Sequence, residues 1–194
     1  MLRRSVRARV SLTAALICFA CAAPPNKEMD QAQGAIDAAR AAGADRYATT
    51  EYAAATDALK NANDAVAVGD YRLALNHALE SREQAQNAAR GAADAKARVR
   101  GDVEHSITEI TALISQARLR LTAAERARVA RRLLQKPRAD LTAAEGALQK
   151  AGEAVAGEDY LSARETLNGV KETVHGALDA INATIAQRVP ARRR

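Results

Sequence analysis

Cys21 is the residue with the clearest potential for chemistry, because it follows a short segment of the type that directs export. The segment opens with four arginines and no acidic residue: Arg3, Arg4, Arg7 and Arg9. Residues 10–19 are then apolar, over a length shorter than the about 20 residues that span a bilayer. Ala20 supplies the small residue expected before a cleavage site. The pattern predicts a signal peptide over residues 1–20, with a thiol directly after the cut.

The residues around that thiol resemble a bacterial lipobox. The resemblance rests on the run Cys18-Phe19-Ala20-Cys21 and on the alanines and prolines that follow it. It implies cleavage before Cys21 and lipid, palmitate included, on the new amine and on the thiol. Alanines rather than an aspartate follow the cysteine. By resemblance to lipoproteins of double-membrane bacteria, this implies an outer-membrane location facing the periplasm. The alternative is an ordinary signal peptide with an incidental cysteine.

Other catalytic or metal-binding sets are not indicated. Cys18 lies in the segment expected to be removed, so a lipidated Cys21 leaves no thiol for a disulfide, a metal or a nucleophile. The histidines stand apart: His77, His105 and His175. Two have a glutamate three residues away, Glu80 and Glu172, which favours helix-surface ion pairs over a metal site. Nucleophile elbows and phosphate-binding glycine loops are also missing from the sequence, so we expect no enzyme, no metal and no cofactor.

The net charge of +6 comes from the two ends of the chain rather than from its body. Four of the positive charges lie in residues 1–20, and three belong to Arg192, Arg193 and Arg194. The remainder is close to neutral, which argues against a nucleic-acid-binding surface over the whole protein. An exported chain also makes RNA or DNA an unsuitable partner.

One internal segment is nevertheless strongly basic. Only Glu125 lies among eight basic residues: Arg118, Arg120, Arg126, Arg128, Arg131, Arg132, Lys136 and Arg138. Leucines and a valine, Leu119 and Leu133 among them, alternate with these residues. A solvated helix face is the simplest interpretation. The sharper hypothesis is a contact with anionic envelope material, meaning phospholipid headgroups, lipopolysaccharide phosphates or an acidic protein.

Composition and periodicity predict an all-α, elongated fold of antiparallel helical hairpins. Alanine supplies much of the 48% hydrophobic content, and aromatic residues make up 3% of the chain. Alanine is the best helix former but buries little area, so close-packed seams are expected rather than a deep pocket. Apolar residues at intervals of three and four predict helices over about 29–42, 50–68, 70–135 and 159–187. Pro137 predicts a break, although the pattern Thr122-Ala-Ala-Glu125 allows an earlier restart.

A motif in the first hairpin recurs after 89 residues. The alanine-leucine pattern that begins at Ala58 begins again at Ala147, and each copy leads into a turn with an Asp-Tyr pair. The turn residues are Gly69, Asp70 and Tyr71 in the first copy and Gly157, Asp159 and Tyr160 in the second. The recurrence predicts an internal duplication of a helical hairpin. We expect the two tyrosines to pack the turns, the alternative being a binding surface built with Tyr47 and Tyr52.

Residues in the first half of the chain also follow a family pattern. They are Cys21-Ala-Ala-Pro-Pro, Ala35, Ile36, Ala39, Ala42, Gly43, Ala44, Tyr47, Ala48, Glu51, Ala58, Leu59, Ala62, Gly69, Asp70, Tyr71 and Ala74. From Cys21 to Gly91 the chain thereby resembles bacterial lipoproteins of domain of unknown function 4398. The resemblance implies an envelope lipoprotein with an antiparallel helical fold, and it brings no activity, cofactor or catalytic residue. The Gly-Asp-Tyr turn is also similar to tetratricopeptide helices, but their period of about 34 residues is missing.

These features divide the chain into segments and suggest three functions. The segments are a signal peptide (1–20), a lipidated cysteine and tether (21–28), a hairpin domain (29–91), a connecting helix with the basic segment (92–137), a second hairpin (138–189) and a basic tail (190–194). The first hypothesis is a membrane-anchored structural or adaptor protein that contacts envelope proteins or peptidoglycan without catalysis. The second is a small-ligand carrier or sensor with a groove between the hairpins. The third is binding of an anionic membrane or lipopolysaccharide through the basic segment.

Overall fold

The computed structural model describes residues 23–188, and this part of the chain is helical and contains no strand. The helices are α1 (Asn26–Ala41), α2 (Ala44–Tyr47), α3 (Thr49–Ala67), α4 (Tyr71–Arg126), α5 (Arg131–Ala156), α6 (Tyr160–Leu167) and α7 (Val170–Arg188). The all-α prediction is therefore confirmed. Residues 1–22 and 189–194, including Cys21 and the arginine tail, lie outside the described part.

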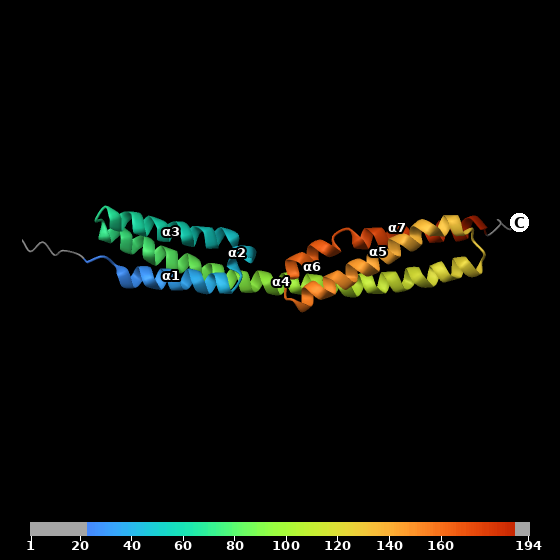
Figure 1. Ribbon diagram of the computed structural model, residues 1–194, viewed down its shortest axis with the longest axis horizontal. Helices are drawn as coiled ribbons and strands as arrows, with labels where there is room; N and C mark the ends of the chain where they lie inside the picture. Colours follow the sequence, from blue (N-terminus) through green and yellow to red (C-terminus); the bar gives the residue numbers. More distant parts are fainter. Residues whose placement is uncertain (1–22, 189–194) are drawn as a thin grey trace, which may run out of the picture.

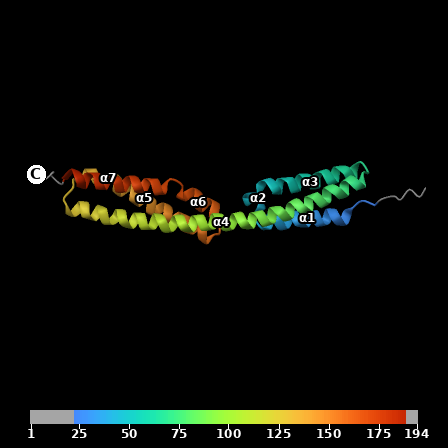
Figure 2. The ribbon, with the colours of Figure 1, turned by 180° about the vertical axis from the view of Figure 1, so that it is seen from behind.

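Helix α4 runs through both bundles of the molecule and connects them. Its 56 residues correspond to a length of roughly 84 Å at 1.5 Å per residue. Helices α1 and α3 pack along its first half, and α5, α6 and α7 pack along its second half (Figure 1). The view from behind shows the same two bundles lying end to end (Figure 2). The predicted elongated, antiparallel arrangement is confirmed, with the two bundles joined by a continuous helix rather than stacked side by side.

The two bundles have different cores, and α4 changes character between them. Its buried residues are alanines and one serine from Ala74 to Ala92, then mainly valine, isoleucine and leucine from Val99 to Leu121. In the first bundle the core cluster consists of Ile36 and alanines. Ser81 is fully buried there, and its hydroxyl donates a 2.8 Å hydrogen bond to the backbone carbonyl of Ala55 on α3. Small side chains thus allow the close helix contacts that the alanine pattern predicted.

The second bundle encloses larger side chains. Its fully or nearly fully buried residues include Val103, Ile110, Leu141, Val174 and Ile181. Apolar burial contributes about 25 cal/mol per Å², so these branched residues contribute more stabilisation per residue than alanines do. The second bundle therefore has a stronger hydrophobic core for a similar number of helices.

The duplicated turns have the same backbone geometry. Asp70 caps α4 by accepting a hydrogen bond from the Leu73 amide, and Asp159 caps α6 by accepting one from the Ser162 amide. The amide of each aspartate also donates at 2.9 Å to the carbonyl of an alanine five residues earlier. The preceding residue is left-handed in both turns, with φ of 78° at Gly69 and 57° at Glu158. Glu158 is therefore the counterpart of Gly69, whereas the sequence pattern assigns that role to Gly157.

Three predicted helix limits differ from the structure. Pro137 lies inside α5 and is buried. A proline removes one helix hydrogen bond, and α5 continues through it because the packing of its buried face outweighs that loss. The chain instead turns at residues 127–130, where Arg128 adopts a φ of 56°. The final helix is interrupted at Gly169, which has a φ of 73°. The segment limits predicted at residues 91 and 137 consequently fall inside α4 and α5.

Candidate functional site

The described chain begins at the outer end of the first bundle. The segment that leads into α1 lies there, close to the turn between α3 and α4 (Figure 1). Cys21 precedes Asn26, the first residue of α1, by five residues, a distance of at most about 18 Å even when fully extended. A lipid on Cys21 would thus hold this end of the rod near a membrane. Between residues 23 and 188, no helix has the length and apolar character needed to cross a bilayer.

The basic segment lies at the opposite end of the rod. Its residues occupy the end of α4, the turn at 127–130 and the start of α5 (Figure 1). Three of the eight predicted residues form ion pairs: Arg118 with Glu145, Lys136 with Asp140, and Arg138 with Glu125. The Lys136 pair has a 2.7 Å contact. Glu125 is the only acidic residue within the segment, but Glu145 and Asp140, which follow it in the sequence, also pair with its basic residues.

The other five residues of the segment have no ion pair among the described residues: Arg120, Arg126, Arg128, Arg131 and Arg132. All five are exposed. We call Arg126, Arg128, Arg131 and Arg132 the basic tip, since they surround the α4–α5 turn. Buried Val129 and Leu134 fix the turn to the second core. Beside them lies an open hollow of about 670 Å³, lined by Arg128, Arg131 and Arg138 together with Glu125 and Gln135.

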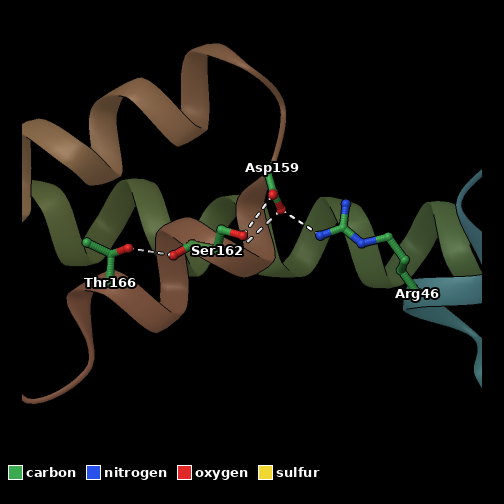
Figure 3. A network of polar contacts seen from close by, with 4 residues as sticks. All are labelled: Arg46, Asp159, Ser162 and Thr166. Carbon is green, nitrogen blue, oxygen red and sulfur yellow. Dashed lines mark hydrogen bonds and ion pairs between the residues drawn. The ribbon is translucent and has the colours of Figure 1, made fainter.

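A second polar cluster joins the two bundles at the middle of the rod. Arg46 of α2 forms a 2.6 Å ion pair with Asp159, which also accepts a hydrogen bond from the Ser162 hydroxyl (Figure 3). Lys96 of α4 forms a 2.8 Å ion pair with Glu158. We call these two ion pairs the waist contacts. The duplicated turn of the second hairpin thus faces the first bundle, whereas Asp70 lies at the outer end.

The waist contacts have electrostatic and packing components. The hydrogen bond from Arg46 and those from Ser162 lower the pKa of Asp159 to about 2. Lys96 also lies 5.8 Å from the centre of the Tyr160 ring. Tyr47 packs against both cores, while its buried hydroxyl has no hydrogen-bond partner among the described residues. Sequence reasoning missed Arg46, since no local pattern relates it to a residue 113 positions away.

Replacing Asp159 by asparagine is expected to weaken the waist, because it removes the charge that pairs with Arg46 while keeping an N-cap. Asp70→Asn is the matched control, since its aspartate caps α4 without an ion pair. The lowered pKa of Asp159 stabilises the folded protein at pH values above the ordinary carboxyl pKa of 3.8. This stabilisation is lost as the pH falls through the folded-state pKa of about 2. Thermal unfolding should show a wild-type advantage over Asp159→Asn that is constant from pH 7 to about 4 and shrinks below. Equal effects of both variants at every pH would contradict this assignment.

The structure agrees with the packing predicted for the turn tyrosines and with one of the two predicted histidine–glutamate pairs. Tyr160 is buried and Tyr71 is partly buried, in line with a packing role. The Nδ1 atom of His77 lies 3.2 Å from the Glu80 carboxylate, so these two side chains meet as predicted. The pair predicted between His175 and Glu172 does not form. Among residues 23–188, no group of three or more His, Cys, Asp or Glu side chains is arranged to hold a metal ion.

A further hollow of about 720 Å³ lies at the junction of α6 and α7 against α4. Asp102, Glu109, Arg164 and Lys171 contribute to its lining, and Glu109 and Lys171 form a 2.6 Å ion pair. The hydrogen bond from Lys171 lowers the pKa of Glu109. All lining residues belong to the second bundle. The hollow is therefore not the groove between the hairpins that the small-ligand hypothesis requires.

Comparison with known proteins identifies part of the chain. No curated protein and no solved structure matches the sequence. A family model matches residues 27–101, which comprise α1, α2, α3 and the first half of α4, and it leaves Cys21 and the basic tip outside. This part of the chain matches the domain of unknown function 4398, as its residue pattern predicted.

Proposed function

We propose that the protein is a lipid-anchored adaptor of the bacterial cell envelope that acts without catalysis. In this proposal Cys21 is acylated and holds the protein at the outer membrane, facing the periplasm. The rod then presents its surface and far end to other envelope proteins or to peptidoglycan. The proposal rests on a single observation, which is the separation of the two ends. The described chain begins at one end of the rod, two residues after Cys21 in the sequence, and α4 spans about 84 Å towards the basic tip at the other end.

The architecture supports a spacing role. Most of the stability of a helix in a protein comes from the packing of its apolar face, and each half of the 56-residue α4 is packed against its own set of helices. The waist contacts join the bundles where the supporting helices change. The ion pairs of Arg100 with Glu104 and of Arg118 with Glu145 are exposed, as is typical of a solvated structural surface. An anchored rod of this kind can hold an envelope component at a defined distance from the membrane.

Photo-crosslinking in the native envelope tests this function. A crosslinking amino acid is placed at Val68, which is 81% exposed near the anchored end, or at Leu119, which is 74% exposed in the second bundle. We expect Val68 to capture components next to the anchoring membrane and Leu119 to capture a different set farther away. Identical products from the two positions would contradict the spacing role.

A further inference from the structure

The basic tip concentrates positive charge in a stretch of chain that carries no acidic residue. Residues 126–139 contain none, and neither do residues 180–188 at the end of α7. Helix α7 packs on both α4 and α5, so its end lies at the same end of the rod (Figures 1 and 2). The body of the chain is close to neutral, so this is a local feature. An anionic partner is the chemistry that such a surface fits.

An exposed leucine beside the arginines limits the kinds of anionic partner that fit the basic tip. Leu133 follows Arg132 directly and remains 46% exposed at the start of α5. Arginines favour phosphate-bearing surfaces, and an exposed leucine among them inserts into the boundary between headgroups and acyl chains. A soluble polyanion would use the arginines alone. The combination therefore favours the surface of an anionic phospholipid bilayer.

The position of the tip decides which bilayer it reaches. On the proposed function, the membrane that holds Cys21 lies at the other end of the rod. A rod standing on that membrane carries Arg126, Arg128, Arg131 and Arg132 about 84 Å away from it. We propose that the basic tip binds the anionic phospholipid surface of a second membrane. The protein would then bridge two bilayers, with a permanent acyl anchor at one end and a reversible electrostatic contact at the other.

Vesicle tethering tests this inference. The protein purified with its own anchor is reconstituted into phosphatidylcholine donor vesicles. Acceptor vesicles contain either phosphatidylcholine alone or phosphatidylcholine mixed with phosphatidylglycerol. We expect capture of the phosphatidylglycerol vesicles only, and loss of capture at 1 M ionic strength, where the Debye length is about 3 Å. Replacing the four tip arginines with glutamine should reduce the affinity for acceptor vesicles by roughly two to three orders of magnitude.

A matched variant separates local charge from total charge. Lys60, Arg72, Arg98 and Lys150 are exposed along the rod and form no ion pair among the described residues. Changing these four to glutamine removes the same charge, and capture should stay within about twofold of wild type. Leu133→Asn should weaken capture about three- to tenfold at unchanged charge.

The outcomes distinguish this inference from the proposed function. Flotation of the donor vesicles with the protein reports the anchor, and acceptor capture reports the tip. Protein that floats but captures no phosphatidylglycerol vesicles, or that loses capture equally in both four-residue variants, overturns the bridging inference alone. Protein that fails to float overturns the anchor. The tip is then judged by direct binding of the same full-length variants to phosphatidylglycerol vesicles, where equal binding of wild type and tip variant overturns it.

Discussion

Replacing Cys21 by serine is expected to abolish palmitate labelling and to move the protein from the membrane fraction to the soluble fraction. A serine offers no thiol for the first acyl transfer. At about 0.8 kcal/mol per buried methylene, an acyl chain of about 16 carbons contributes roughly 12 kcal/mol of membrane binding, and further chains make it effectively permanent. Radiolabelling and fractionation of cell envelopes measure both effects.

Cys18→Ser is the control for this experiment. Cys18 lies in the segment expected to be removed, so its variant should be labelled and retained like the wild type. Palmitate labelling that survives in Cys21→Ser would contradict the lipobox interpretation. Equal loss of labelling in both variants would assign the effect to signal-peptide processing and would equally remove the evidence for acylation at Cys21.

Replacing Leu141 by alanine is expected to destabilise the second bundle strongly. Leu141 is fully buried on α5, in the cluster that includes Ile110 and Val174. Removing its branched end leaves a cavity and should lower the free energy of unfolding by about 2–5 kcal/mol. Denaturant unfolding followed by circular dichroism measures the change.

Leu133→Ala is the matched control for Leu141→Ala. Both leucines lie on α5 and the chemical change is the same, but Leu133 is 46% exposed. Its truncation should lower the free energy of unfolding by less than about 1 kcal/mol. If the two variants had equal stability, the core of the second bundle would not be where the structure places it.

Local features of the fold could be predicted from the sequence because they depend on neighbouring residues. Alanine periodicity indicates the helices, and the recurring Asp-Tyr pair indicates the two turns. The break predicted at Pro137 was wrong. The general preference of proline against helix interiors is outweighed by the packing of the buried Pro137 in α5. The α4–α5 turn has no sequence signal, because Arg128 adopts a left-handed conformation that usually marks glycine.

The arrangement of the bundles could not be predicted, because it depends on contacts between distant residues. Arg46 and Asp159 lie 113 positions apart, and no repeat or charge pattern connects them. The basic segment can be identified from composition, but composition cannot separate its ion-paired residues from the four of the basic tip. That separation follows from the antiparallel register of α4 and α5, which brings Arg118 to Glu145 and Arg138 to Glu125.

The height of labelled residues above a membrane tests the central claim, an anchored rod, most directly. With Cys21 acylated and Cys18 removed, a cysteine at Val68 or Leu119 would be the single reactive thiol for a fluorophore. Val68 lies just before the first residue of α4 and Leu119 lies in its second half, so the two positions are roughly 70 Å apart along the rod. Energy transfer to an acceptor dye in phosphatidylcholine vesicles should be strong from Val68 and close to zero from Leu119. Equal transfer from both positions would show that the protein lies flat on the membrane, and would contradict the account.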